Sequence, residues 1–310
     1  MINTVTLNPA IDKVFFIDEF RRNITNRIKN SIDTIGGKGT HVSINLKLFG
    51  LGSRAFGLCH GENGRRIMAM LAEHDVTVRF VHRQEGNSRT NYLVVENSSD
   101  STLITEKGMP FTEDDFADLL ILMKKEMNSG DYLVLSGDAS NADPSVLGRL
   151  IRELEEKKPK VFLDTSGAAL KECAGLGPFL LKPNLDELSF LCGRTVTNKS
   201  DDVIDAVTSL AHYNINVIAV SLGGDGSILC ANKEIYRAVP PLVKAINTVG
   251  CGDCYLSGLL FGITNELPFE ETLKIATAAS AAKAESHLTA GFDPDRYKSL
   301  AVQVKVQKIG

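Results

Sequence analysis

The stretch DYLVLSGDASNADPSVLGRLIRELEEK, residues 131 to 157, contains both halves of a βα unit. Its first part is a short apolar run that ends in small and polar residues, which is typical of a buried strand. Its second part repeats apolar residues at helical spacing, from Val146 to Leu154. A buried strand followed at once by an amphipathic helix is the repeating unit of a parallel sheet covered by helices.

The same unit recurs along the chain, in KVFLDTSG, FLLKPN and NVIAVSLGGDG. Helical periodicity and helix-start residues predict further helices near 112–128, 200–213, 252–265, 268–285 and 293–303. In open α/β sheets, ligands bind at the carboxyl ends of the strands. The polar residues at those ends therefore predict one shared rim, formed by Ser136, Asp164, Asn184 and Ser221.

Two segments, 13–32 and 88–106, break this rhythm because they alternate apolar and polar residues without helices between them. The second contains a turn sequence, NSSD, at 97–100. They predict a small antiparallel sheet that serves as a lid, a subunit interface or both, over a main domain of 1–12, 33–87 and 107–310. The alternative is that both segments are edge strands of the main sheet.

The composition points to a small soluble partner. The chain has 310 residues and a formal net charge of -4, so no basic excess favours a nucleic acid or an anionic membrane. No apolar run approaches the roughly 20 residues of a membrane span, and the N-terminus lacks a signal-peptide pattern. The six cysteines are scattered, which fits a reducing compartment. We expect a cytoplasmic protein without nucleic-acid or membrane partners.

Two glycine-rich stretches open helices. In IGGKGTHVSINLKLFG, residues 35–50, the glycines leave backbone N–H groups uncovered at a helix N-terminus beside Lys38, which suits an anionic ligand. In TVGCGD, residues 248–253, Gly250, Cys251 and Gly252 can form an anion-binding nest. Asp253 would then either cap the helix or accept a proton beside a bound phosphate.

Cys251 and Cys254 have the Cys-x-x-Cys spacing of redox and zinc sites. A structural zinc site needs four ligands, and the sequence has no second pair at a matching spacing. The alternative of a redox or metal protein nevertheless stays open at this point. A cysteine at a helix N-terminus can also have a lowered pKa, which would make it reactive.

Two further stretches have both a structural and a functional interpretation. In KPNLDEL, residues 182–188, the side chains of Asn184 and Glu187 would form a capping box, or would hold Mg²⁺ through water near Lys182. In SLGGDG, residues 221–226, the glycines would either join two strands or let a nucleotide phosphate approach the backbone.

In this order, TLNPAID, GGKG, KPNLDEL, SLGGDG and GCGD resemble the motifs of the ribokinase-type sugar kinases, in the phosphofructokinase B branch. The resemblance runs from Met1 to about Asp295. It implies a ribokinase-like three-layer αβα sandwich with a mostly parallel central sheet and a small β-sheet lid. The TLNPAID start is similar to that of kinases whose acceptor is already a phosphosugar.

The resemblance implies transfer from ATP, with Mg²⁺, to a ketohexose phosphate, with fructose 1-phosphate first and tagatose 6-phosphate or fructose 6-phosphate as alternatives. Asp253 would be the catalytic base, with Gly250, Cys251 and Gly252 as the anion hole. The implied substrate contacts are Asp12, Gly37, Lys38, His41, Arg89, Ser136 and, from the lid of the same or a partner subunit, Arg27. The implied ATP contacts are Lys182, Asn184, Glu187, Ser221, Gly223 and Gly226, with Glu187 near the metal through water. We expect a homodimer formed through the lid.

Three positions depart from the family pattern. His41 stands where the family has asparagine, Asp138 stands in SGDAS where a serine is expected, and Cys251 replaces alanine. The first two motivate an alternative hypothesis, a sugar-phosphate sensor that keeps the fold without catalysis.

Overall fold

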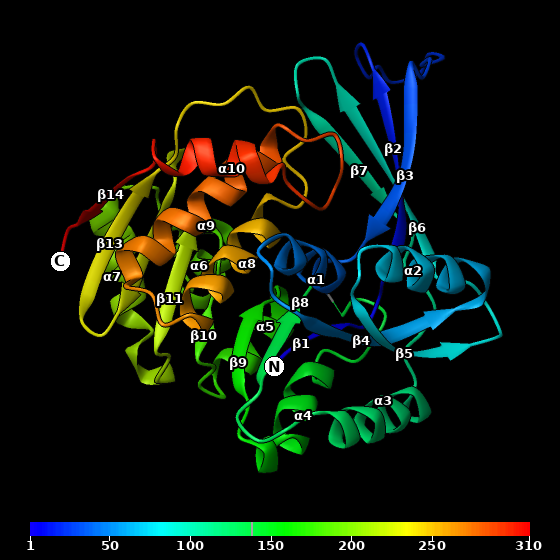
Figure 1. Cartoon of the computed structure of the whole chain (residues 1–310), viewed down its shortest axis with the longest axis horizontal. Helices are drawn as coiled ribbons and strands as arrows, with labels where there is room; N and C mark the ends of the chain where they lie inside the picture. The colour runs from blue at the N-terminus through cyan, green and yellow to red at the C-terminus, as the bar shows by residue number, and fades with distance from the viewer. Residues whose placement is uncertain (138) are drawn as a thin grey trace.

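The computed structural model describes residues 1–137 and 139–310, so the expectation for Asp138 lies outside the described residues. Within these ranges the main sheet has ten strands, in the order β14-β13-β12-β11-β10-β9-β8-β1-β4-β5 (Figure 1). Neighbours from β5 to β11 run parallel, and β12, β13 and β14 pair antiparallel. The strands are β1 Ile2–Thr6, β4 Ser53–His60, β5 Thr77–Arg83, β8 Tyr132–Ser136, β9 Lys160–Asp164, β10 Leu180–Leu181, β11 Val217–Ser221, β12 Ser227–Ala231, β13 Glu234–Val239 and β14 Lys305–Lys308.

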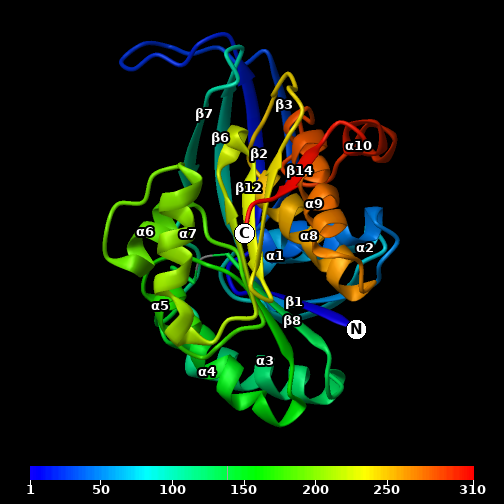
Figure 2. The ribbon, with the colours of Figure 1, turned by 90° about the vertical axis from the view of Figure 1, so that its left-hand side faces the viewer.

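Helices cover both faces of this sheet, so the three-layer sandwich is confirmed (Figure 2). One face packs against α3 Glu113–Glu126, α4 Val146–Glu153, α5 Gly167–Ala174, α6 Leu185–Cys192 and α7 Ser200–Ser209. The other packs against α1 Lys38–Leu48, α2 Gly61–Glu73, α8 Cys251–Thr264, α9 Phe269–Ala284 and α10 Pro294–Ala301. No helix in the described ranges is both long and apolar enough to cross a membrane.

The helices predicted from periodicity are confirmed, and their ends follow local chemistry. Thr112 begins α3 with a capping box to Asp115, and Asp293 caps α10. Helix α8 packs closely against α9. Glycine at position 258 permits this approach, since a Cβ there would lie 2.5 Å from the Ala276 backbone. The first turn of α8 carries Asp253.

The two alternating segments form a separate sheet of order β3-β2-β6-β7, so they are not edge strands of the main sheet. Its strands are β2 Ala10–Ile17, β3 Asn30–Gly36, β6 Arg89–Glu96 and β7 Ser101–Thr105, which begin before residue 13 and extend beyond residue 32. The NSSD turn between β6 and β7 is confirmed. The expectation of a fully antiparallel sheet was wrong, because the central pair, β2 and β6, runs parallel.

This second sheet stands beyond the carboxyl ends of the main strands (Figures 1 and 2). Its Val14, Leu93 and Val95 form a buried apolar cluster against which Val249 packs. Phe16 makes an edge-on ring contact with His287 at 5.0 Å between centroids. The second sheet therefore packs against the segment 248–253, called here the glycine loop, which leads into α8.

Candidate active site

A polar cavity of about 400 Å³ lies between the main strand ends and the second sheet. The predicted rim is confirmed: Ser136 ends β8, Asp164 ends β9, Ser221 ends β11, and Asn184 pairs with Ser221. The cavity brings together thirteen of the predicted site residues, namely Asp12, Gly37, Lys38, His41, Arg89, Ser136, Lys182, Asn184, Glu187, Ser221, Gly250, Gly252 and Asp253.

A second cavity, also about 400 Å³, adjoins the first at Ser221 and Gly252. Gly223, Gly226 and Cys251 line it together with apolar residues of α9 and of the segment 240–245. Sequence analysis missed this segment, although the apolar run VPPLV at 239–243 could have indicated an apolar cavity wall. The first cavity is lined mainly by polar residues and the second more by apolar ones, and Gly252 of the glycine loop lines both.

The glycine loop has the geometry of an anion site, with one correction. Gly250 has φ +87°, and a Cβ there would lie 1.8 Å from the Thr289 carbonyl oxygen, so only glycine fits. The Cys251 N–H donates to the Thr248 carbonyl at 3.2 Å, so it is already engaged, contrary to the expectation of three uncovered donors. The Gly252 N–H makes no hydrogen bond within the described residues, and Gly252 lines both cavities.

The cysteine pair is not bonded, and burial shifts the pKa of both thiols upward. Cys251 and Cys254 are both free thiols, and no group of three or more potential metal ligands occurs in the described part of the chain. Burial raises the pKa of the Cys251 thiol, and raises the pKa of Cys254 well above its ordinary value. This direction is opposite to the lowering expected at a helix N-terminus, and its main cause is the removal of the thiols from water.

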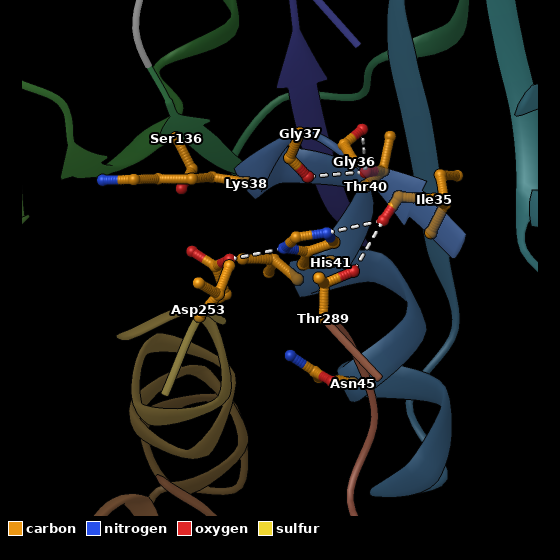
Figure 3. A network of polar contacts seen from close by, with 12 residues as sticks. Ile35, Gly36, Gly37, Lys38, Thr40, His41, Asn45, Ser136, Asp253 and Thr289 are labelled. Atoms are coloured by element: carbon orange, nitrogen blue, oxygen red, sulfur yellow. Dashed lines mark hydrogen bonds and ion pairs between the residues drawn. The ribbon is translucent and has the colours of Figure 1, made fainter. Parts of the chain in front are cut away.

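His41 contacts the Asp253 carboxylate in the cavity (Figure 3) and lies near a second carboxylate, that of Asp12. Its Nδ1 lies 2.7 Å from Oδ2 of Asp253, and its Nε2 lies 2.9 Å from the Ile35 carbonyl oxygen and 4.0 Å from Oδ2 of Asp12. Asp12 also accepts a hydrogen bond from Asn91 Nδ2 at 2.8 Å. Burial raises the pKa of Asp12 despite these partners. Sequence analysis missed Asn91, although it lies in the same SRTNY motif as Arg89.

Asp164 holds two lysines at the floor of the cavity. Its Oδ1 lies 3.1 Å from Lys182 Nζ and 3.4 Å from Lys38 Nζ, and the Ser136 hydroxyl lies 3.4 Å from its Oδ2. Burial alone would raise the pKa of Asp164, but the Lys182 and Lys38 ammonium groups hold it below its ordinary value. The Asp164 carboxylate in turn raises the pKa of Lys38. Lys182 also lies beside the glycine loop, 3.6 Å from where a Cβ of Gly252 would be.

At the mouth of the cavity, the structural interpretation of KPNLDEL is confirmed. Asn184 caps α6 by accepting the Glu187 N–H at 2.8 Å, and Glu187 Oε2 accepts the Asn184 N–H at 2.9 Å. The SLGGDG motif likewise joins β11 to β12 through a 3-10 turn at Gly223–Asp225. Both motifs also line the cavities, so their functional interpretation stays a prediction.

The two predicted arginines are placed differently. Arg89 lies at the start of β6 and lines the polar cavity, where its Nε donates to the Asn8 carbonyl at 3.1 Å. Arg27 is exposed in the segment between β2 and β3, and it lines neither of the two cavities. This chain alone therefore does not bring Arg27 to the site.

Comparison with known proteins agrees with this geometry. Residues 5–296 match the pfkB family carbohydrate kinases. The chain is 32% identical to 1-phosphofructokinase of Bacillus subtilis over 287 residues, covering 92% of this chain and 93% of the other. It is 30% identical to tagatose-6-phosphate kinase of Staphylococcus epidermidis over 316 residues, covering 100% of each. Phosphofructokinase-2 from Escherichia coli, solved in complex with substrates and products, matches with a TM-score of 0.89 at 26% identity, over 97% of this chain and 98% of that one. The chain therefore belongs to the pfkB family of carbohydrate kinases, phosphotransferases that use an alcohol group as acceptor.

Proposed function

We propose that the protein transfers the γ-phosphoryl group of ATP to a ketohexose phosphate, with fructose 1-phosphate as the first candidate acceptor and fructose 1,6-bisphosphate as the product. The family implies ATP as cosubstrate. The observation that carries the proposal is the position of Asp253, which lines the polar cavity next to the loop where the two cavities meet. A carboxylate beside an open backbone N–H suits proton abstraction next to a transferring phosphoryl group.

In the proposed step, the acceptor hydroxyl gives its proton to Asp253 while its oxygen bonds to the γ-phosphorus. The bond between that phosphorus and the bridging β–γ oxygen breaks, and ADP leaves. The Gly252 N–H and the Lys182 ammonium, which lie beside each other in the cavity, would stabilise the charge that develops on the phosphoryl oxygens. Little covalent chemistry is required of the protein, so most of the rate enhancement comes from positioning and charge stabilisation.

The nucleotide would occupy the more apolar cavity, with its base near the segment 240–245 and its phosphates toward Ser221, Gly223 and Gly226. Magnesium takes few carboxylates and keeps several waters, so Glu187 at the cavity mouth fits a water-mediated ion better than a direct ligand cage. Bound there, the ion would neutralise charge on the phosphates. The acceptor would occupy the polar cavity, with Asp12 and Gly37 near its hydroxyls.

A phosphorylated acceptor is supported by the cations around the polar cavity. Lys38 on α1 and Arg89 on β6 both line it, and an arginine fork is well suited to a phosphate. The relatives at 32% and 30% identity are named for different phosphosugars, so tagatose 6-phosphate and fructose 6-phosphate are the alternative acceptors.

Replacement of Asp253 by asparagine tests the assignment of the base. The variant keeps the shape of the side chain but cannot accept the proton, so we expect turnover to fall by a factor of about 10² or more while nucleotide binding is retained. Asp295→Asn is the matched control, because its side chain is 92% exposed on α10. Near-normal turnover in Asp253→Asn would show that another group is the base.

The acceptor is identified by coupled ADP release with fructose 1-phosphate, fructose 6-phosphate, tagatose 6-phosphate and the unphosphorylated sugars. The highest kcat/KM is expected for fructose 1-phosphate. A preference for an unphosphorylated sugar would contradict the proposed role of Lys38 and Arg89.

We further propose that the second sheet is a lid and the surface of a homodimer. Ile11 and Ile35 of this sheet pack on α1 and α2. Strand β7, at the edge of the sheet, is exposed along its length, and Ile104 on it is 54% exposed. An open edge strand with apolar residues is a surface on which another chain can pair. A partner's lid is also the route by which Arg27 would reach a phosphate.

A further inference from the structure

The buried side chain of His41 is fixed by two short contacts on opposite sides of its ring. Only 4% of the residue is exposed. Nδ1 faces Oδ2 of Asp253 at 2.7 Å, and Nε2 faces the Ile35 carbonyl oxygen at 2.9 Å (Figure 3). The same carbonyl accepts the Thr289 hydroxyl at 3.0 Å. The ring therefore connects the first turn of α8 with the end of β3.

These two contacts determine how many protons His41 and Asp253 share. A carbonyl oxygen only accepts hydrogen bonds, so Nε2 must carry a hydrogen and donate it. A neutral imidazole has one N–H, which would leave the lone pair of Nδ1 facing an ionised carboxylate 2.7 Å away. Because two acceptors do not attract at that distance, the contact requires one additional proton between His41 and Asp253.

The charges around the pair favour placing that proton on the ring. Two carboxylates face His41, Asp253 from α8 and Asp12 from β2. Farther out, Lys38 and Lys283 act on Asp253, and Arg89 acts on Asp12. Burial alone would lower the pKa of His41, but the hydrogen bond and charge of Asp253, with the charge of Asp12, raise it above the ordinary value.

We propose that His41 is a positioning residue which, as an imidazolium ion, orients Asp253 for proton abstraction, and that loss of its proton at high pH reduces phosphoryl transfer. This inference rests on the proposed function. With Oδ2 held by His41, the other oxygen of Asp253 is left to meet the acceptor hydroxyl. Since the ring also donates to Ile35 on β3, the orientation of the base is coupled to the position of the second sheet.

Two amide variants separate the two contacts. The amide nitrogen of asparagine lies near the position of Nδ1, whereas that of glutamine lies near Nε2. His41→Asn should keep a donor toward Asp253 but cannot titrate, so the fall of kcat/KM at high pH should disappear. His41→Gln keeps only the Ile35 contact, and we expect kcat/KM at pH 7 to fall by about ten- to a hundredfold, the usual effect of losing a hydrogen bond to a charged group.

The pH profile has a defined sign. His41 is charged below its native pKa and neutral above it, so the wild-type kcat/KM should fall as pH rises through that value. Ionisation of the substrate phosphates, near pH 6, lies on the acidic side and does not mimic this fall. His74→Asn, at an exposed position after α2, is the matched control and should leave the profile unchanged.

A measurement without turnover separates this inference from the proposed function. NMR titration of isotope-labelled histidine in the wild-type protein should show the His41 ring titrating above pH 6.5, and Asp253→Asn should lower its titration point. The inference is overturned if the ring is neutral at pH 6, if Asp253→Asn leaves its titration unchanged, or if His41→Asn keeps the wild-type basic limb. Absence of kinase activity with a normally charged His41 would instead contradict the proposed function alone.

Discussion

Among single residues, Asp164 is the carboxylate that pairs with two lysines in the polar cavity. It is buried and holds two ammonium groups, and one of them, Lys182, is only 5% exposed. Replacing one partner of a buried ion pair leaves the others uncompensated, so Asp164→Asn should lower the free energy of unfolding by about 3 kcal/mol at pH 7. Urea unfolding measures this loss.

The pH dependence of that loss follows from the lowered pKa of Asp164. The carboxylate contributes stability above its unfolded pKa of about 3.9, and this contribution disappears as pH falls through the lower native value. The difference between wild type and variant should therefore shrink below pH 4. Asp75→Asn is the matched control, because Asp75 pairs with Lys47 while 79% exposed and should change stability little. An equal loss at pH 7 and pH 3 would contradict the ion-pair explanation.

Sequence reasoning placed Asp164 on the rim but did not pair it with the lysines, and it did not anticipate the contact of His41 with Asp253. His41 and Asp253 are 212 positions apart in the sequence, and no local pattern encodes which side chains meet across such a separation. For Cys251, local reasoning gave the wrong direction of the pKa shift, because burial is a property of the folded molecule.

At the scale of the element, α6 combines a helix cap with the proposed metal site. Glutamine also serves at the third position of a capping box, so Glu187→Gln should preserve the stability of the helix while removing the negative charge. We expect the Mg²⁺ concentration for half-maximal activity to rise about tenfold. Asn184→Ala should instead cost about 1 kcal/mol of stability, measured by urea unfolding. Unchanged Mg²⁺ dependence in Glu187→Gln would leave capping as the role of this carboxylate.

Elements were the most predictable level of the structure, because periodicity and capping act over a few residues. The helices from α7 onward and the NSSD turn follow the predictions closely. The direction of the β2–β6 pair could not be predicted in this way, since alternation along a strand says which residues share a face but nothing about the direction of its neighbour.

At the scale of the whole molecule, the proposed homodimer makes the second sheet a shared surface. Register places Lys13, Tyr92 and Ile104 side by side across β2, β6 and β7. Ile104→Glu would bury a charge in that interface, so we expect light scattering to report a monomer at micromolar concentration where the wild type is a dimer. Ile121→Glu, at a 66% exposed position on α3, should stay dimeric. A monomeric wild-type protein, or a dimeric Ile104→Glu, would contradict the assignment.

The parallel pairing of β2 with β6 also has a consequence for the order of folding. Asp12 and Asn91, which meet in this pair, are separated by 79 positions. Each hairpin forms locally, but the pair closes a long loop that contains β4, α2 and β5, and closing such loops slows folding. Asp12 and Arg89 therefore reach the cavity only when the two hairpins have joined. A chain with a finished main sheet but unjoined hairpins would already have its glycine loop and still lack part of the lining of the polar cavity.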